Sequence, residues 1–172
     1  MGEFNTIEQE DIIKLIQGMG RTISDLESEV LRLRSGSSTL VAKPANETVN
    51  GSDTLQDDDD LVLAIKANEV WSFTLYLRYN SGTTPDFKFK FTVPSGTTMQ
   101  FASSYHGNGG YDETDTLTMD GFGADNWSTI LTGTIVASTT PGDVTLQWAQ
   151  NTSTASDTKV LKGSYIVAHR IS

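Results

Sequence analysis

The sequence has no cysteine, and only four prolines and two histidines among its 172 residues. Without cysteine the chain cannot form disulfides, bind zinc through thiolates or use a thiol as a nucleophile. The two histidines lack the spacing of a metal site, and no Gly-x-Ser-x-Gly segment marks a hydrolase nucleophile. We therefore expect no enzyme, no catalytic residues, no cofactor and no resident metal ion.

Positive charge is also scarce, because 12 Lys and Arg face 22 Asp and Glu, for a net charge of −10. Such a chain is a poor partner for nucleic-acid phosphates or for an anionic membrane surface. No apolar run approaches the ~20 residues of a membrane span, and no basic segment followed by an apolar run opens the sequence. We expect neither nucleic acid nor membrane as a partner, and no Sec signal.

The clearest positive signal lies between residues 12 and 33. Apolar residues recur there at alternating spacings of four and three: Ile12, Ile16, Met19, Ile23, Leu26, Val30 and Leu33. In an α-helix this spacing forms one narrow apolar seam, the pattern of a coiled coil. A capping-box sequence starts at Thr6 and a Ser-Gly pair follows Arg34, so the predicted helix runs from about residue 7 to residue 34.

The heptad positions predict how copies of this helix associate. Glu29 falls at a g position and Arg34 at the following e position, the spacing of an interchain ion pair in a parallel assembly. Ile13 and Leu15 widen the seam at its start, which favours a homotrimer over a dimer. The alternative is an amphipathic helix that packs against the chain's own β-domain. Gly18 and Gly20 weaken the helix in either case.

The sequence after residue 38 predicts short β-strands. Residues 86–93 alternate apolar and polar side chains, with Phe87, Phe89 and Phe91 on one face, and residues 70–79 alternate in the same way. About eight such strands, with turn signals roughly every 8–12 residues, predict an antiparallel β-sandwich or jelly-roll-like head. The expected organisation is an oligomerising or anchoring helix in residues 1–35, a linker with the first strand in 36–56, and the β-sandwich head in 57–172.

Four consecutive aspartates, Asp57–Asp60, raise the question of a calcium site, because hard cations prefer clustered oxygens. The run lacks both the alternation of ligands and the glycine of an EF-hand loop. We therefore predict a solvated acidic segment that leads into the strand at residues 61–65.

Three aromatic residues lie in or beside segments rich in Asn, Asp and Gly: Tyr105, Tyr111 and Trp127. Exposed aromatics in such surroundings suit a sugar-binding or protein-docking surface. They equally suit side chains that plug the ends of a sandwich.

A short coiled coil, the joint Ser35-Gly36-Ser37-Ser38 and a cysteine-free β-head rich in Thr, Ser and Gly resemble the small structural and fibre-like proteins of tailed-phage virions. Residues 57–91 and 162–168 carry the likeness within the head. The resemblance implies a virion location after assembly in the host cytoplasm, a homotrimer with sandwiches around an axis, and partners among other virion proteins. It covers capsid decoration proteins, head fibres and minor tail proteins, and brings no catalytic residues.

The leading hypothesis is therefore a non-enzymatic virion structural protein that decorates the particle or contacts the host surface, a glycan included. The alternative is a carbohydrate-binding β-sandwich module in which Tyr105, Tyr111 and Trp127 stack on sugar rings. A hydrolase on a jelly-roll scaffold is a third, weaker hypothesis.

Overall fold

A computed structural model describes the backbone of residues 9–36 and 38–172, and their side chains except at 9–11, 28, 29, 31–35 and 108. The chain divides into two compact units, Met1–Ser37 and Ser38–Ser172. The capping residue expected at Thr6 lies outside the described residues.

The first unit contains the predicted helix. Helix α1 spans Gln9–Ser35, 27 residues, which corresponds to about 40 Å at ~1.5 Å per residue. It ends at the Ser-Gly pair that the sequence suggested. Within the described residues, no helix combines the length and hydropathy that a membrane span requires.

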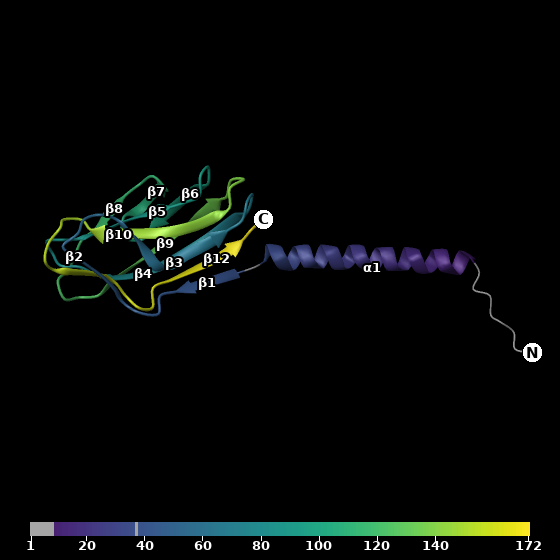
Figure 1. Ribbon diagram of the computed structural model, residues 1–172, viewed down its shortest axis with the longest axis horizontal. Coiled ribbons are helices and arrows are strands. Elements are labelled where there is room, and N and C mark those ends of the chain that lie inside the picture. The colour runs from purple at the N-terminus through teal and green to yellow at the C-terminus, as the bar shows by residue number, and fades with distance from the viewer. Residues whose placement is uncertain (1–8, 37) are drawn as a thin grey trace, which may run out of the picture. The chain divides into compact units, whose positions relative to one another are not determined.

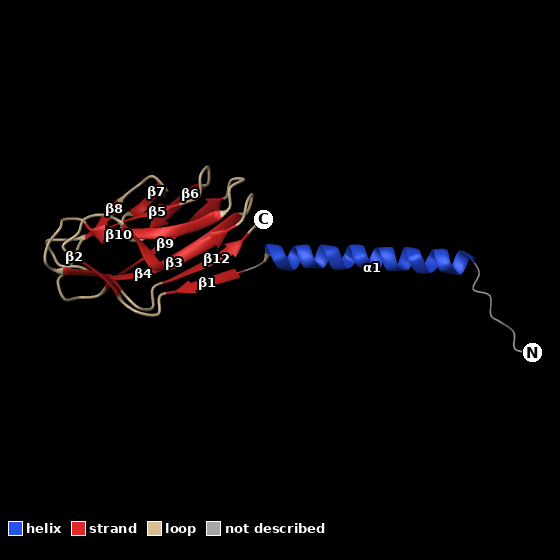
Figure 2. Ribbon diagram, viewed as in Figure 1, coloured by secondary structure: helices blue, strands red, loops and turns tan. Residues whose placement is uncertain are grey.

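The second unit is a β-sandwich of two antiparallel sheets, formed only by strands, turns and loops (Figures 1 and 2). The larger sheet has the order β1 (Ser38–Ala42), β12 (Tyr165–Arg170), β4 (Val70–Asn80), β9 (Trp127–Val136), β6 (Thr98–Ser103) and β7 (Gly107–Asp112). To it also belong β11 (Asp157–Val160) and β2 (Glu47–Asn50), with β11 pairing β2 and β4. The smaller sheet has the order β3 (Gln56–Ile65), β10 (Gly142–Gln150), β5 (Phe87–Thr92) and β8 (Leu117–Met119). The predicted fold class, mainly β with an N-terminal helix, is confirmed.

The core lies between the two sheets and follows from the alternation of side chains along the strands. Phe87, Phe89 and Phe91 of β5 are at most 2% exposed, and β4 contributes its own alternate residues to the same cluster. Trp148 of β10 stacks on Phe87 with 5.8 Å between ring centroids. A period of two places every second residue on the buried face, so the apolar pattern alone orients these strands.

Two strands occupy segments that the sequence predicted as polar connections. Strand β2 lies within the expected linker and pairs with β11. Strand β7 pairs with β6 and lies within residues 103–115, a Gly-rich passage that the sequence predicts as a loop. Residues 159–171, which the sequence pattern predicts as one closing strand, instead contain the end of β11 and the whole of β12, separated by a turn at residues 161–164 where Gly163 adopts φ +83°. These short polar strands are held by hydrogen bonds to partner strands, so their own residues do not show the apolar alternation that predicts a strand.

Gly133 shows how closely the central strands of the larger sheet approach one another. It lies in β9 opposite Phe101 of β6. A Cβ atom at this position would lie 2.1 Å from the carbonyl oxygen of Gln100 and 2.7 Å from the Phe101 Cβ. No side chain fits there without moving the β6 backbone.

Replacement Gly133→Ala should therefore lower the free energy of unfolding by about 1–3 kcal/mol or more, the usual cost of overpacking. Gly110→Ala is the matched control, because a Cβ there meets no atom within 4 Å. Urea denaturation of both variants measures the difference. Equal stability of the two variants would show that β6 yields without strain.

Candidate interaction surfaces

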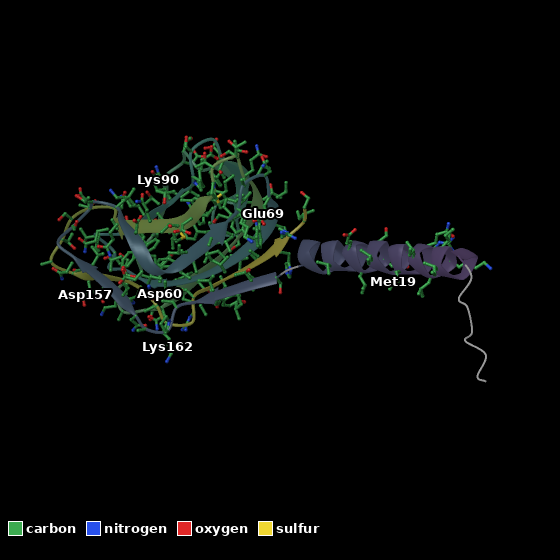
Figure 3. All side chains as sticks on the ribbon, turned by 45° about the vertical axis from the view of Figure 1, so that its right-hand side comes forward. Met19, Asp60, Glu69, Lys90, Asp157 and Lys162 are labelled. Atoms are coloured by element: carbon green, nitrogen blue, oxygen red, sulfur yellow. The ribbon has the colours of Figure 1, made fainter. Side chains whose placement is uncertain are left out.

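The apolar seam of α1 is exposed to solvent. Six of its residues have described side chains, and each is between 45% and 62% exposed: Ile12, Ile16, Met19, Ile23, Leu26 and Val30. Met19 projects from the ribbon in Figure 3. The side chains of the seventh residue, Leu33, and of the predicted ion pair, Glu29 and Arg34, lie outside the described residues, so these assignments stay predictions.

Gly18 shapes the surface beside this seam. It leaves a hollow lined by Lys14, Leu15, Gly18, Met19, Thr22 and Ile23. The Thr22 hydroxyl, at the edge of this hollow, donates a hydrogen bond to the Gly18 carbonyl at 3.1 Å. A hollow next to an apolar row has the form of the hole that receives a side chain from a facing helix.

The Asp57–Asp60 run is not uniformly solvated, which corrects the prediction. Asp57 and Asp59 are exposed, but Asp58 is only 1% exposed. Its carboxylate accepts hydrogen bonds from the Lys43 ammonium at 2.9 Å, the Trp148 indole N–H at 3.1 Å and the Leu61 backbone N–H at 2.8 Å. The run therefore starts strand β3 with one side chain turned into the protein.

Lys43 is the centre of this cluster. Its ammonium also contacts Glu47 at 2.5 Å and Asp60 at 3.1 Å. Oxygens of Glu47, Asp58 and Asp60 lie within 4.8 Å of one another, the grouping that a metal ion could use. The lysine ammonium already lies between these carboxylates, so we interpret the cluster as an internal ion network that joins residues of the two sheets.

The electrostatics of Lys43 agree with this interpretation. Burial acts to lower the pKa of the ammonium, but the hydrogen bonds to Glu47 and Asp58 outweigh it and raise the pKa above the ordinary 10.5. A raised pKa means that the charged Lys43 stabilises the fold at neutral pH and up to its ordinary pKa of 10.5, and that this contribution is lost as pH rises through the folded-state pKa.

The predicted binding aromatics fall into two separate groups. Tyr105 and Tyr111 are partly buried against the core, and the ring of each contacts the His106 ring, with centroids 5.0 and 5.7 Å apart. Burial raises the pKa of Tyr105, and its hydroxyl accepts a hydrogen bond from the Asp120 backbone N–H. Trp127 is 42% exposed and stacks on Phe122 at 3.8 Å. Ligand binding by the three residues stays a prediction.

His106 contacts a serine, which is the pattern that a hydrolase hypothesis would need. Its Nδ1 lies 3.3 Å from the Ser103 hydroxyl, and its Nε2 lies 2.8 Å from the Thr118 carbonyl oxygen. Ser103 is only 1% exposed, so an external substrate cannot reach this hydroxyl. The pair braces the segment between β6 and β7.

A large part of the outer face of the larger sheet, across β1, β12, β4, β9 and β6, carries no Asp, Glu, Lys or Arg. The strand register places its outward side chains in three rows. They are Ser38, His169, Ser72, Thr134 and Gln100; then Leu40, Val167, Thr74, Thr132 and Ala102; then Ala42, Tyr165, Tyr76 and Ile130. All of them are exposed or partly exposed. We call this surface the charge-free face.

The charge-free face includes large apolar groups. Leu40 is 68% exposed and Ile130 is 44% exposed. Between them lie Tyr76 and Tyr165, with ring centroids 5.5 Å apart. The outer face of the smaller sheet differs, because it carries Asp57 of β3 and the lysines Lys88 and Lys90 of β5, with Lys90 labelled in Figure 3.

Neither Lys43 nor the charge-free face was identified from the sequence. One signal was available, since the alternation in residues 70–79 places Tyr76 on the polar side of its strand. The rows themselves depend on a register that only the fold supplies.

No protein-family model matches the chain, and no curated protein does. Among solved structures, the chain is similar to the tripod from the baseplate of bacteriophage Tuc2009, with 11% identity and a TM-score of 0.36 over 77% of this chain and 63% of that one. It is also similar to the CBM22-1–GH10 modules of the Clostridium thermocellum endo-1,4-β-D-xylanase 10B, with 11% identity and a TM-score of 0.35 over 77% of this chain and 24% of that one. A third similarity is to infectious bursal disease virus, Gt strain, at 9% identity and a TM-score of 0.24, over 78% and 36% of the two chains. The chain spans less than two thirds of the length of each of these chains.

Replacement Lys43→Met keeps the length of the side chain but leaves Asp58 as an unpaired buried carboxylate. The free energy of unfolding should fall by about 3–5 kcal/mol, as for other broken buried ion pairs. Urea denaturation at neutral pH provides the measurement. At the exposed Lys162, the same change should cost less than about 0.5 kcal/mol. A similar loss in both variants would mean that the cluster contributes no more than a surface charge.

Proposed function

We propose that the protein is a non-enzymatic structural protein of a phage virion, which assembles as a homo-oligomer through α1. A trimer is favoured over a dimer. The sandwich then forms the part that decorates the particle, contacts other virion proteins or contacts the host surface. The observation that carries the self-assembly is the exposed seam of α1. The virion class is supported by the resemblance of the sequence to small phage structural proteins.

The seam is energetically unsuited to a lone helix in water. Its six described residues repeat at the spacing that keeps them facing a partner helix over successive heptads. Burying the exposed half of such a side chain contributes about 1 kcal/mol. An isolated helix gains little from its own propensity, and Gly18 and Gly20 reduce it further. Association of several copies would bury the seam and, by the same contacts, stabilise the helix.

Assembly through the helix has a direct consequence for the sandwich. It holds several identical heads at a high local concentration, so a weak contact made by each head becomes a strong one for the assembly. This is a useful property for a protein that decorates a particle or contacts a cell surface.

A carbohydrate-binding module remains a second candidate, favoured by one observation. Trp127 is exposed and its ring is backed by Phe122 at 3.8 Å, a stacked pair that holds one aromatic surface in place. If this pair binds sugar, Trp127→Ala should abolish hits on a glycan array without changing the oligomer mass. Absence of hits with the wild-type chain would contradict this second function.

The self-assembly is tested by placing charge in the seam. Ile23→Asp with Leu26→Asp should reduce the solution mass from a multiple of 18.7 kDa, three being expected, to 18.7 kDa. The reason is that buried unpaired carboxylates are costly in a helix interface. Gln17→Asp with Ser24→Asp is the matched control, since it adds the same charge at two positions outside the seam and should leave the mass unchanged.

Sedimentation equilibrium of the full chain measures all three proteins. A wild-type mass of 18.7 kDa over the whole concentration range would contradict the proposed assembly. An equal loss of mass in the seam variant and the control would show that charge on the helix, rather than the seam, controls association.

A further inference from the structure

The absence of charge on one broad surface is unexpected in this chain. Asp and Glu number 22 and Lys and Arg number 12. Nevertheless three consecutive rows of outward positions across five adjacent strands contain none of them. Charged residues lie at the borders of this area: Asp112 of β7 is opposite Gln100, and Arg78 of β4 is two residues beyond Tyr76. The uncharged area is therefore bounded and not a general property of the surface.

Electrostatics indicate what can approach this face. Two copies that each carry a net charge of −10 repel one another. They meet most readily through a surface that places no like charges in contact. The cores of protein interfaces are depleted in charge and enriched in tyrosine, which describes the row with Tyr76 and Tyr165.

Chain connectivity indicates which copies these are. Strand β1 begins three residues after α1 ends at Ser35, and Leu40 of β1 follows two residues later. Five residues of extended chain reach at most about 18 Å. Association of the helices therefore brings the β1 strands of neighbouring copies close together. Leu40 is the most exposed apolar side chain of β1.

We infer that the charge-free face is the contact between the sandwiches of neighbouring copies in the oligomer. This inference rests on the proposed self-assembly and adds the surface through which the heads associate. Leu40 of β1 and Ile130 of β9 lie on the strands that flank β12 and β4, which carry the two tyrosines. The face is poorly suited to a sugar ligand, because Gln100 is the only side-chain amide and no carboxylate or guanidinium is present to bind sugar hydroxyls in a fixed orientation.

The absence of native cysteine permits a direct test. Thr132→Cys places one thiol on the face, on a strand separated from β1 by β12 and β4. Ala64→Cys places one thiol at an exposed position of β3, on the smaller sheet. Both full-length variants carry the same helix and the same tether, so only the position of the thiol differs.

Treatment of each assembled variant with a short bismaleimide, followed by denaturing electrophoresis, gives the rate of cross-linking between copies. The Thr132→Cys variant should cross-link about ten-fold faster than the Ala64→Cys variant, because a fixed contact adds to the effective concentration that the tether provides. Equal rates in a preparation whose mass is still oligomeric would overturn the contact between heads and leave assembly by the helix intact. A monomeric mass for the wild-type chain would instead overturn the self-assembly itself.

A second variant tests the same contact without a thiol. Thr132→Glu is a change at an exposed position, so the sandwich should retain its unfolding midpoint, but it introduces like charges where copies meet. The heads should separate, and the sedimentation coefficient should fall while the mass remains oligomeric. Ala64→Glu should change neither. An unchanged sedimentation coefficient for Thr132→Glu, or binding of a glycan to this face that Thr132→Glu removes, would contradict the contact between copies.

Discussion

The buried ion network around the Lys43 ammonium is the interaction that links the two sheets of the sandwich. It follows β1 in the larger sheet, yet two of its three carboxylate partners, Asp58 and Asp60, belong to β3 in the smaller one. Asp58 in turn accepts from the Trp148 indole, whose ring stacks on Phe87 in the core. A charge buried in this way is tolerated only because its partners surround it. The network thus links the two sheets, which are made from segments distant in sequence.

The two exposed apolar surfaces have different physical origins. The seam of α1 is a local feature, since residues three and four apart share one side of a helix. The charge-free face is a collective feature, assembled from five strands. Both leave apolar groups in water, and the proposed oligomer would cover both, because helices associated through the seam would hold the heads close enough for weak contacts between faces.

The parts of the fold that could be predicted are those with a strong period in their own residues. Helix α1 and strand β5 are examples. In α1 the spacing of Ile16, Met19 and Ile23 indicates the seam, and in β5 the alternation of Phe87, Phe89 and Phe91 indicates the buried face. Strands β2 and β7 could not be predicted. Glu47–Asn50 is polar and short, and its strand state comes from hydrogen bonds to Asp157–Val160, more than a hundred residues later.

By itself, the sequence determined the helix with its seam, the mainly β class, the buried side of the longer strands and the strongly negative charge. Each of these depends on neighbours within one element. The tertiary structure alone decided that Asp58 is buried while Asp57 and Asp59 are exposed, because the burial depends on Lys43 and Trp148. It also decided that Leu40, Tyr165, Tyr76 and Ile130 lie on one face. A single strand shows which side a residue takes, but only the pairing register shows which residues of other strands lie beside it.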